Sequence, residues 1–354
     1  MKHTKTFSER MRRILALSLA LLAALSLAAC GENRKSTREV YAMDTIMTLT
    51  AYGTDGEKGL DAAESVILAM DVTLDPELTT STVYAINHAK GQSVVIPAQV
   101  AKMLSTAKTV YDQSGGALDL SIYPLVKRWG FVDQKYYKPT EAEIAGDLSL
   151  LCFDKISLTS FPSTGSYSLT LPDYGEISFA AVAKGCAAEN AVDAMRQVGV
   201  KSAIISLGGN VQTLGVKPDG SLWKVAIQDP ENPDGYVATV RVGEMAVVTS
   251  GPYERNFTQK GVLYHHILNP ATGHPSSSSL RSVTILCDDG TMADCLSTAM
   301  FVLGESKALN YWRQYGGFEM ILITNDDRII CTKGLLESFT LEQGGSKYSV
   351  SYCE

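Results

Sequence analysis

The sequence predicts an α+β fold, in which helices and strands are mixed without the regular alternation of a doubly wound sheet. Segments with apolar side chains at helical spacing occur in both halves of the chain, and short apolar segments typical of strands lie between them. No internal repeat is visible at any fixed period. We therefore expect one mixed fold rather than an array of similar units.

The first 29 residues have the composition of a lipoprotein signal peptide. Residues 1–13 carry five basic side chains against the single acid Glu9, and residues 14–29 are apolar and uncharged. That run is shorter than the about 20 residues that a membrane-spanning helix needs. Leu27-Ala28-Ala29-Cys30 resembles a bacterial lipobox, so we expect a lipidated Cys30 to anchor the protein outside the cytoplasmic membrane. The alternative is an ordinary cleaved signal peptide with a cysteine at this position by chance.

The predicted mature chain is long enough for one large domain or two closely packed ones, because removing 29 of the 354 residues leaves 325. The net charge of -7 and the absence of a basic block argue against nucleic acid as a partner. No later segment is a long uncharged apolar run, so we expect the mature chain to be tethered rather than membrane-spanning. Its cysteines after Cys30 show neither a disulfide framework nor zinc-site spacing, so their pairing stays open.

Two helices are predicted in the first half of the mature chain. Apolar side chains recur at helical spacing over residues 59–72 and again over residues 97–114, and Gly115-Gly116 ends the second helix. Residues 34–40 are expected to link the lipid anchor to the folded domain. The charged and irregular segment 133–161 is interpreted as an insertion or a small subdomain.

Two more helices are predicted in the second half, over residues 184–198 and 294–303. The predicted strands are short segments rich in β-forming or apolar side chains, and several are bounded by glycine or proline. They are residues 45–52, 167–171, 202–207, 223–227, 237–242, 246–249, 282–286 and 320–324.

Four polar, glycine-rich patches interrupt the apolar pattern, and two of them suit a phosphate ligand. Ala183-Lys184-Gly185 stands at a predicted helix start, where unpaired N–H groups and the positive end of the helix dipole favour an anion. Leu207-Gly208-Gly209-Asn210 leaves a predicted strand, and its glycines allow the backbone to approach a ligand closely. The alternatives are a lysine at a surface turn and a turn without function.

The third patch, residues 249–255 followed by residues 264–273, contains a candidate base. Adjacent side chains of a strand point to opposite faces, so only one of His265 and His266 can serve a given site. An imidazole with a pKa near 6.5 is a suitable general base for a hydroxyl nucleophile. The alternative is a structural histidine in the core or on the surface.

The fourth patch, residues 294–298, contains candidate metal ligands. Asp294 and Thr298 are four residues apart and so share a helix face. A carboxylate together with hydroxyl or carbonyl oxygens suits Mg²⁺, which usually keeps waters and takes phosphate oxygens. The alternative is that Asp294 caps the helix.

In this order, the patches resemble the motifs of the ApbE family of FAD:protein FMN transferases. The resemblance implies a T-fold-like architecture over residues 41–354, after the signal peptide and the anchor segment 30–40, with two packed α/β halves and a flavin cleft between them. Three residues depart from the common family pattern, namely Asp44, Cys186 and Asn269. The matching motifs are Met43-Asp44-Thr45, residues 81–87, Gly115-Gly116-Ala117-Leu118-Asp119, Pro124-Leu125, Trp129-Gly130-Phe131, Ala183-Lys184-Gly185, Gly208-Gly209-Asn210, Thr249-Ser250-Gly251, residues 266–273 and Ala293-Asp294.

The resemblance also implies an activity: Mg²⁺-dependent transfer of the FMN moiety of FAD to a threonine hydroxyl of an acceptor protein, with release of AMP. It implies that His266 is the catalytic residue and that the carbonyl of Ala183 and the side chains of Asp294 and Thr298 hold Mg²⁺. The residues implied to line the FAD site are Met43, Thr45, Lys184, Gly209, Thr249, Ser250 and Gly251. The implied acceptors are similar to the flavin-carrying subunits of sodium-pumping NADH:quinone reductase or of the Rnf complex.

Three other functions are compatible with parts of the sequence. A Mg²⁺-dependent FAD pyrophosphatase, which gives FMN and AMP, would use the same residues. A flavin-binding lipoprotein would not need Asp294, Thr298 and His266 together, because binding alone requires no base. A solute-binding lipoprotein of a transporter would share the lipobox but would not account for the ordered motifs.

Overall fold

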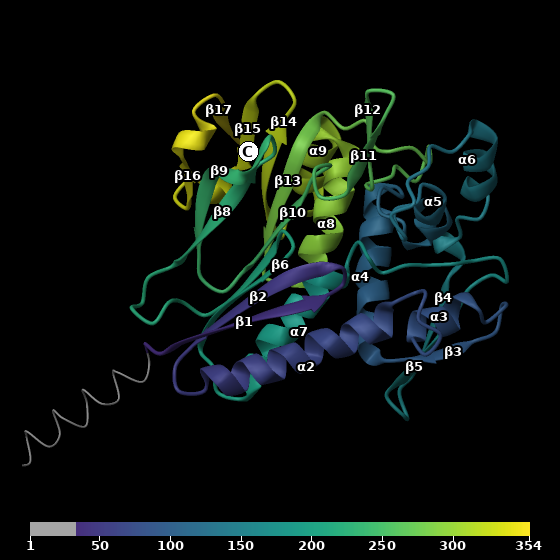
Figure 1. Cartoon of the computed structure of the whole chain (residues 1–354), viewed down its shortest axis with the longest axis horizontal. Coiled ribbons are helices and arrows are strands. Elements are labelled where there is room, and N and C mark those ends of the chain that lie inside the picture. The colour runs from purple at the N-terminus through teal and green to yellow at the C-terminus, as the bar shows by residue number, and fades with distance from the viewer. Residues whose placement is uncertain (1–32) are drawn as a thin grey trace, which may run out of the picture.

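The computed structural model describes residues 33–354, so the predicted signal peptide and the predicted lipidation of Cys30 lie outside the described residues. A nine-stranded sheet with the order β1-β2-β6-β7-β10-β13-β14-β15-β17 forms its centre (Figure 1). Adjacent strands are antiparallel except β15 and β17, which are parallel. The strands are β1 (Lys35–Ala42), β2 (Thr45–Tyr52), β6 (Ser202–Leu207), β7 (Asn210–Leu214), β10 (Ala246–Ser250), β13 (Leu280–Cys287), β14 (Glu319–Thr324), β15 (Arg328–Thr332) and β17 (Ser349–Cys353).

Helices pack against one face of this sheet. Their apolar stripes form the largest core together with strand residues such as Met320 and Leu322 of β14. The helices of this layer are α2 (Gly56–Leu74), α4 (Ala98–Ser114), α7 (Ala183–Gln197), α8 (Gly290–Leu303) and α9 (Glu305–Tyr315). Among them, α8 contacts β10 and β13 directly, which brings its polar residues to the end of β10.

A second, smaller sheet covers the other face. It consists of β16 (Phe339–Leu341), β9 (Asn232–Val242) and β8 (Trp223–Asp229). Ile321 and Ile323 of β14 pack on this side, whereas Met320 and Leu322 pack against the helices. This alternation is expected for a strand with both faces buried. The mixed helix and strand content confirms the α+β prediction.

The remaining elements lie beside the helical layer (Figure 1). A third core there contains Leu125, Trp129, Phe131, Ile144 and Leu268. The strands of this part are β3 (Val94–Ile96), β4 (Ser157–Phe161) and β5 (Ser166–Thr170). The hairpin of β11 (Asn256–Gln259) and β12 (Val262–His265) packs against the third core. Its helices are α3 (Thr82–Asn87), α5 (Tyr123–Arg128) and α6 (Glu141–Leu148), and four 3-10 turns complete the described chain: Leu120–Ile122, Phe153–Lys155, Lys333–Leu335 and Gln343–Gly345.

Three local predictions differ from the structure. Residues 34–40, predicted as a linker, lie mostly in the edge strand β1, in which the small or apolar side chains of Ser36, Val40 and Ala42 are buried between exposed polar ones. The helix predicted to begin at residue 294 begins at Gly290. The side chain of Asp289 caps this helix, because it accepts a hydrogen bond from the N–H of Met292. The segment 133–161, predicted as irregular, contains α6 and β4. No helix within residues 33–354 is both long and apolar enough to cross a membrane.

Candidate functional site

The turn between β6 and β7 forms the centre of the candidate site. Gly208 and Gly209 have positive φ angles of 47° and 88°, which glycine adopts without strain. A Cβ atom on Gly208 would lie 2.7 Å from Oγ1 of Thr45, the first residue of β2, so the close approach of these two residues requires glycine. The turn thus keeps Thr45 beside it and leads into Asn210, which is 2% exposed.

The hairpin turn between β1 and β2 places Met43 near this centre. Met43 and Asp44 have positive φ angles of 50° and 58°, as in the tight turns that suit hairpins. The N–H of Met43 donates a hydrogen bond to Oδ1 of Asp71 on α2 at 2.8 Å. The carboxylate of Asp44 lies 3.5 Å from the guanidinium of Arg255. These two contacts fix the turn between α2 and the segment that follows β10.

The first turn of α7 meets α8 at Gly185. The N–H of Gly185 donates a hydrogen bond to Oδ2 of Asp294 at 2.8 Å. A Cβ atom on Gly185 would lie 2.1 Å from the carbonyl oxygen of Gly290 and 2.7 Å from Cβ of Asp294. Only glycine therefore allows the two helices to approach so closely. As a result, Ala183 and Lys184, in the same turn of α7, lie next to the Asp294 carboxylate.

Asp294 is buried, with 4% of its surface exposed. Burial raises the pKa of this carboxyl group, whereas the Lys184 ammonium and the hydrogen bond from the Gly185 N–H act in the opposite direction. The Nδ2 atom of Asn210 is buried and has no hydrogen-bond partner within the described residues. A cation beside this carboxylate would offset the energetic cost of burying its charge.

The end of β10 connects the glycine turn to α8. The N–H of Thr249 donates a hydrogen bond to the carbonyl of Gly209 at 3.3 Å. The hydroxyl of Ser250 lies 2.8 Å from that of Ser297 and 3.5 Å from that of Thr298. Gly251 follows, where a Cβ atom would lie only 2.3 Å from the ring of Tyr253. Hydroxyl groups from two elements therefore line one side of the site.

The two adjacent histidines point in opposite directions, as expected. Nε2 of His265 lies 3.1 Å from the carbonyl of Ser276, and its ring packs edge-on against Phe301. Nδ1 of His266 lies 3.1 Å from the carbonyl of Arg255. Because a carbonyl can only accept, Nδ1 of His266 must carry the proton, which leaves Nε2 with a free lone pair.

The surroundings keep the imidazole of His266 neutral. Burial lowers its pKa to about 3, and the positive charges of Lys184 and Arg255 act in the same direction. The side chain is half-buried rather than enclosed, so a substrate hydroxyl can reach it. His266 therefore has the tautomer and the charge state that a proton acceptor needs at neutral pH.

Glu254 also belongs to this site, although it was not among the predicted site residues. A Cβ atom on Gly209 would lie 3.0 Å from Oε1 of Glu254. Burial raises the pKa of this carboxyl group, while Lys184 and Arg255 act to lower it. Lys184 itself forms no ion pair in the part of the chain that the structure describes. Its ammonium thus faces the carboxylates of Asp294 and Glu254 without pairing with either, and it can bind an anionic ligand.

The donor set fits Mg²⁺ bound together with a phosphate. Residues 33–354 contain no group of three or more His, Cys, Asp and Glu side chains that could hold a metal ion. Mg²⁺ does not need such a group, because it takes hydroxyl, carbonyl, water and phosphate oxygens around one or two carboxylates. Asp294 supplies one carboxylate, Thr298 stands one helical turn later, and Ala183 begins the helix that abuts Asp294. The metal and FAD-binding roles of these residues remain predictions.

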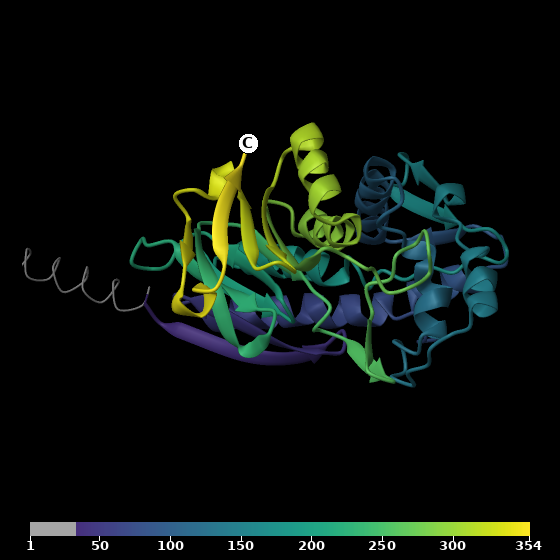
Figure 2. The ribbon, with the colours of Figure 1, turned by 90° about the horizontal axis from the view of Figure 1, so that it is seen from above.

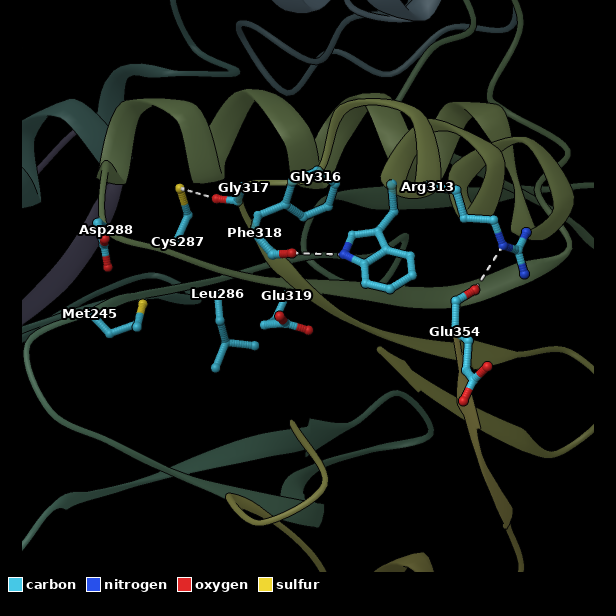
Figure 3. Close-up of a pocket in the computed structure, with 11 residues that line it drawn as sticks. Met245, Leu286, Cys287, Asp288, Arg313, Gly316, Gly317, Phe318, Glu319 and Glu354 are labelled. Atoms are coloured by element: carbon cyan, nitrogen blue, oxygen red, sulfur yellow. Dashed lines mark hydrogen bonds between the residues drawn. The ribbon is translucent and has the colours of Figure 1, made fainter. Parts of the chain in front are cut away.

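A separate pocket of about 490 Å³ lies elsewhere, at the ends of β13 and α9 (Figure 3). Trp312 donates a hydrogen bond to the carbonyl of Phe318, and Arg313 donates one to the carbonyl of Glu354. None of the predicted site residues lines this pocket. The cysteines of the described chain are unpaired, and all of them except Cys353 are buried: Cys152, Cys186, Cys287, Cys295 and Cys331.

Comparisons with known proteins agree with the geometry. The model of the ApbE family matches residues 43–322. A protein of Klebsiella pneumoniae (strain 342) named FAD:protein FMN transferase is 31% identical over 325 residues, which cover 91% of this chain and 99% of the relative. A protein of Treponema pallidum (strain Nichols) with the same name is 28% identical over 320 residues, with coverages of 86% and 88%.

Two solved structures have a similar fold. The flavinyl transferase ApbE of Pseudomonas stutzeri, in its apo form, has a TM-score of 0.72 and 26% identity, with coverage of 83% of this chain and 92% of the other. The ApbE protein of Thermotoga maritima has a TM-score of 0.75 and 22% identity, with coverages of 89% and 99%.

Proposed function

The chain belongs to the ApbE family, and we therefore propose that it is a FAD:protein FMN transferase. One observation supports the assignment above the others: Lys184 of α7 lies close enough to both Asp294 of α8 and His266 to shift the pKa of each. An unpaired cation, a buried carboxylate and a neutral imidazole are the groups that attack of an alcohol on a pyrophosphate requires.

In the proposed reaction the acceptor threonine attacks the phosphorus of the FMN half of FAD. The Oγ–P bond forms as the bond from that phosphorus to the bridging oxygen breaks, so AMP leaves with the bridging oxygen. Nε2 of His266 takes the threonine proton. Lys184 and the N–H groups of the first turn of α7 balance the charge of the pyrophosphate.

We also propose that Asp294, Thr298 and the carbonyl of Ala183 hold Mg²⁺. When bound, this ion would neutralise charge on the phosphate oxygens during displacement of AMP. The remaining ligand positions would be filled by water and by the pyrophosphate. Asp294 supplies the single carboxylate of this proposed ligand set, which suits an ion that Mg²⁺-binding proteins usually share with substrate phosphates.

The location and the acceptor are further proposals, which the sequence supports. The lipobox ending at Cys30 favours a lipid anchor, with the folded domain outside the cytoplasmic membrane. The acceptor would then be an extracytoplasmic flavoprotein domain, similar to the flavin-carrying subunits of sodium-pumping NADH:quinone reductase or of the Rnf complex. A membrane-bound acceptor and a membrane-anchored enzyme would meet at the same surface.

The proposal is tested by incubating the full-length protein with FAD, Mg²⁺ and an acceptor domain that bears the threonine. We expect a mass increase of the acceptor equal to one FMN, with in-gel flavin fluorescence, and loss of both when EDTA is added. Release of FMN and AMP without labelling of several such acceptors would instead identify a FAD pyrophosphatase. Bound but intact FAD would reduce the function to flavin binding.

A further inference from the structure

The β11–β12 hairpin leads directly into the proposed base. β12 ends at His265, and His266 is the next residue. The hairpin projects from the body (Figures 1 and 2), and Arg255 at its base pairs with Asp44 in the turn between β1 and β2. Within the described residues no other strand pairs with β11 or β12. An open two-stranded sheet therefore stands at the edge of the candidate site.

An aromatic stack holds this hairpin in place. The rings of Tyr136 and Phe257 are stacked with centroids 5.0 Å apart, and those of Phe257 and Tyr264 with centroids 5.2 Å apart. Tyr264 in turn packs 5.4 Å from Trp129, whose indole N–H donates to the carbonyl of Gly273 at 2.9 Å. The hairpin is thus fixed to the body on one side, so its free edge keeps a defined position relative to His266.

Two adjacent aliphatic side chains of β12 face solvent. Val262 is 51% exposed and Leu263 is 50% exposed. Both follow the tight turn of Lys260 and Gly261, which have φ angles of 51° and 77°. Because adjacent strand residues point to opposite faces, the two side chains expose apolar surface on both faces of the hairpin, beside a strand edge that another chain can cover.

Basic side chains lie on and beside the hairpin. The segments 134–139 and 255–265 contain Lys135, Lys138, Arg255 and Lys260 but no acidic residue, in a chain with a net charge of -7. Lys135 pairs with the neighbouring Asp133, and Arg255 with Asp44. Lys138 lies over the Tyr264 ring, 5.7 Å from its centre, and neither Lys138 nor Lys260 forms an ion pair in the described chain. Two cations near the hairpin are therefore free to meet an acidic partner.

We propose that the β11–β12 hairpin is the docking surface for the acceptor protein, and that it binds an acidic, extended segment next to the modified threonine. This inference rests on the proposed function, because only a transferase must bring a protein hydroxyl to His266. An acceptor segment along the open edge of the hairpin places alternate side chains against Val262 on one face and Leu263 on the other, and a carboxylate near Lys138 or Lys260. Leu263 and His266 are three residues apart, about 10 Å in an extended chain, so a segment of a few residues spans both contacts.

The test compares two double variants with matched controls in the labelling reaction. Val262→Ser with Leu263→Ser removes the apolar contact, and Lys138→Glu with Lys260→Glu reverses the charge. The control for the first is Leu336→Ser, a substitution of an aliphatic residue that is 61% exposed in another region. The control for the second is Lys307→Glu with Lys333→Glu, two exposed lysines without ion pairs in the described chain.

We expect both double variants to raise the KM for the acceptor about tenfold or more, while the Kd for FAD and the control variants stay within about twofold of the unmodified protein. We also expect the charge-reversed variant to lose the salt dependence of the acceptor KM. An unchanged acceptor KM in both variants would overturn the docking surface and leave the transferase assignment intact. A parallel loss of FAD binding would also overturn it, because the side chains would then support the FAD site. Failure of the unmodified protein to label any acceptor would instead refute the proposed function.

Discussion

Replacement of His266 by alanine separates proton transfer from FAD binding. The substitution removes the imidazole whose Nε2 is free because Nδ1 is held by the carbonyl of Arg255 at 3.1 Å. A positioned general base contributes roughly 10²- to 10⁴-fold to a rate, so we expect the rate of FMN transfer to fall by about that factor. Lys184 and the first turn of α7 remain in place, so the Kd for FAD should stay within about twofold.

The assay measures single-turnover labelling of the acceptor at saturating FAD and Mg²⁺, together with FAD binding by flavin fluorescence. His88→Ala is the matched control, because His88 is exposed just after the end of α3 and contacts Tyr84 rather than the site. Between pH 5 and 8 the labelling rate of the unmodified protein should show no step that His266 controls, because its pKa is about 3. Full activity of the alanine variant, with unaltered FAD binding, would refute the role of His266 as the base.

Three further predictions concern the metal, the helix contact and acid stability. Asp294→Asn should weaken Mn²⁺ binding, measured by electron paramagnetic resonance in the presence of FAD, by about 100-fold, and unchanged binding would exclude Asp294 as a ligand. Gly185→Ala should lower the free energy of unfolding by about 1–3 kcal/mol or more, measured in urea, because its Cβ would lie 2.1 Å from the carbonyl oxygen of Gly290; an unchanged midpoint would show that α7 and α8 can separate without cost. The pKa of His266 is lower in the folded protein than in the unfolded chain, so the unfolded chain binds a proton first as the pH falls. The contribution of His266 to the free energy of unfolding is therefore fully present above pH 6.5 and is lost as the pH falls towards 3, by at most about 1.4 kcal/mol per pH unit. The difference in free energy of unfolding between the unmodified protein and His266→Ala should shrink over that range, and a constant difference would show that folding does not lower the pKa of His266.

The strands that the sequence identifies best are those with apolar side chains on both faces or with turn residues at both ends. Residues 45–52 and 202–207 were predicted with the bounds that β2 and β6 have. The second of these ends at a glycine pair with positive φ angles, a sharp local signal. The sequence also predicts the two helices of the first half. The helix predicted over residues 59–72 covers Gly56–Leu74, and the one predicted over residues 97–114 covers Ala98–Ser114.

Edge strands and helix starts are harder to predict, because contacts with residues elsewhere in the fold determine them. β1 is polar on its exposed side and is a strand because β2 supplies its hydrogen bonds, so its composition alone resembles that of a linker. At α8 the sequence contains several aspartates in succession, and the structure selects Asp289 as the cap. This choice leaves Asp294 inside the helix, one turn later, where it accepts a hydrogen bond from Gly185 instead.

The order of the motifs in the sequence predicts the candidate site, whereas the contacts between the motifs can be identified only in the structure. Glu254 illustrates the limit, since it lies within the patch 249–255 but was not distinguished from its neighbours in the sequence. Its relevance follows from its approach to Gly209 and Lys184, which come from two other elements. No local periodicity reports such a contact, because the three residues meet only when β6, α7 and the segment after β10 have assembled.

The glycines of the motifs have a different role from the one that their local sequence indicates. In isolation, a glycine pair or a glycine at a helix start indicates close approach of a ligand to the backbone. In the structure, Gly208 makes room for Thr45, and Gly185 makes room for Gly290 and Asp294. These glycines therefore bring protein elements together, and the side chains thus gathered form the site. A substitution at either glycine should accordingly impair stability together with catalysis, whereas a substitution of His266 should leave the arrangement of these elements and the Kd for FAD unchanged.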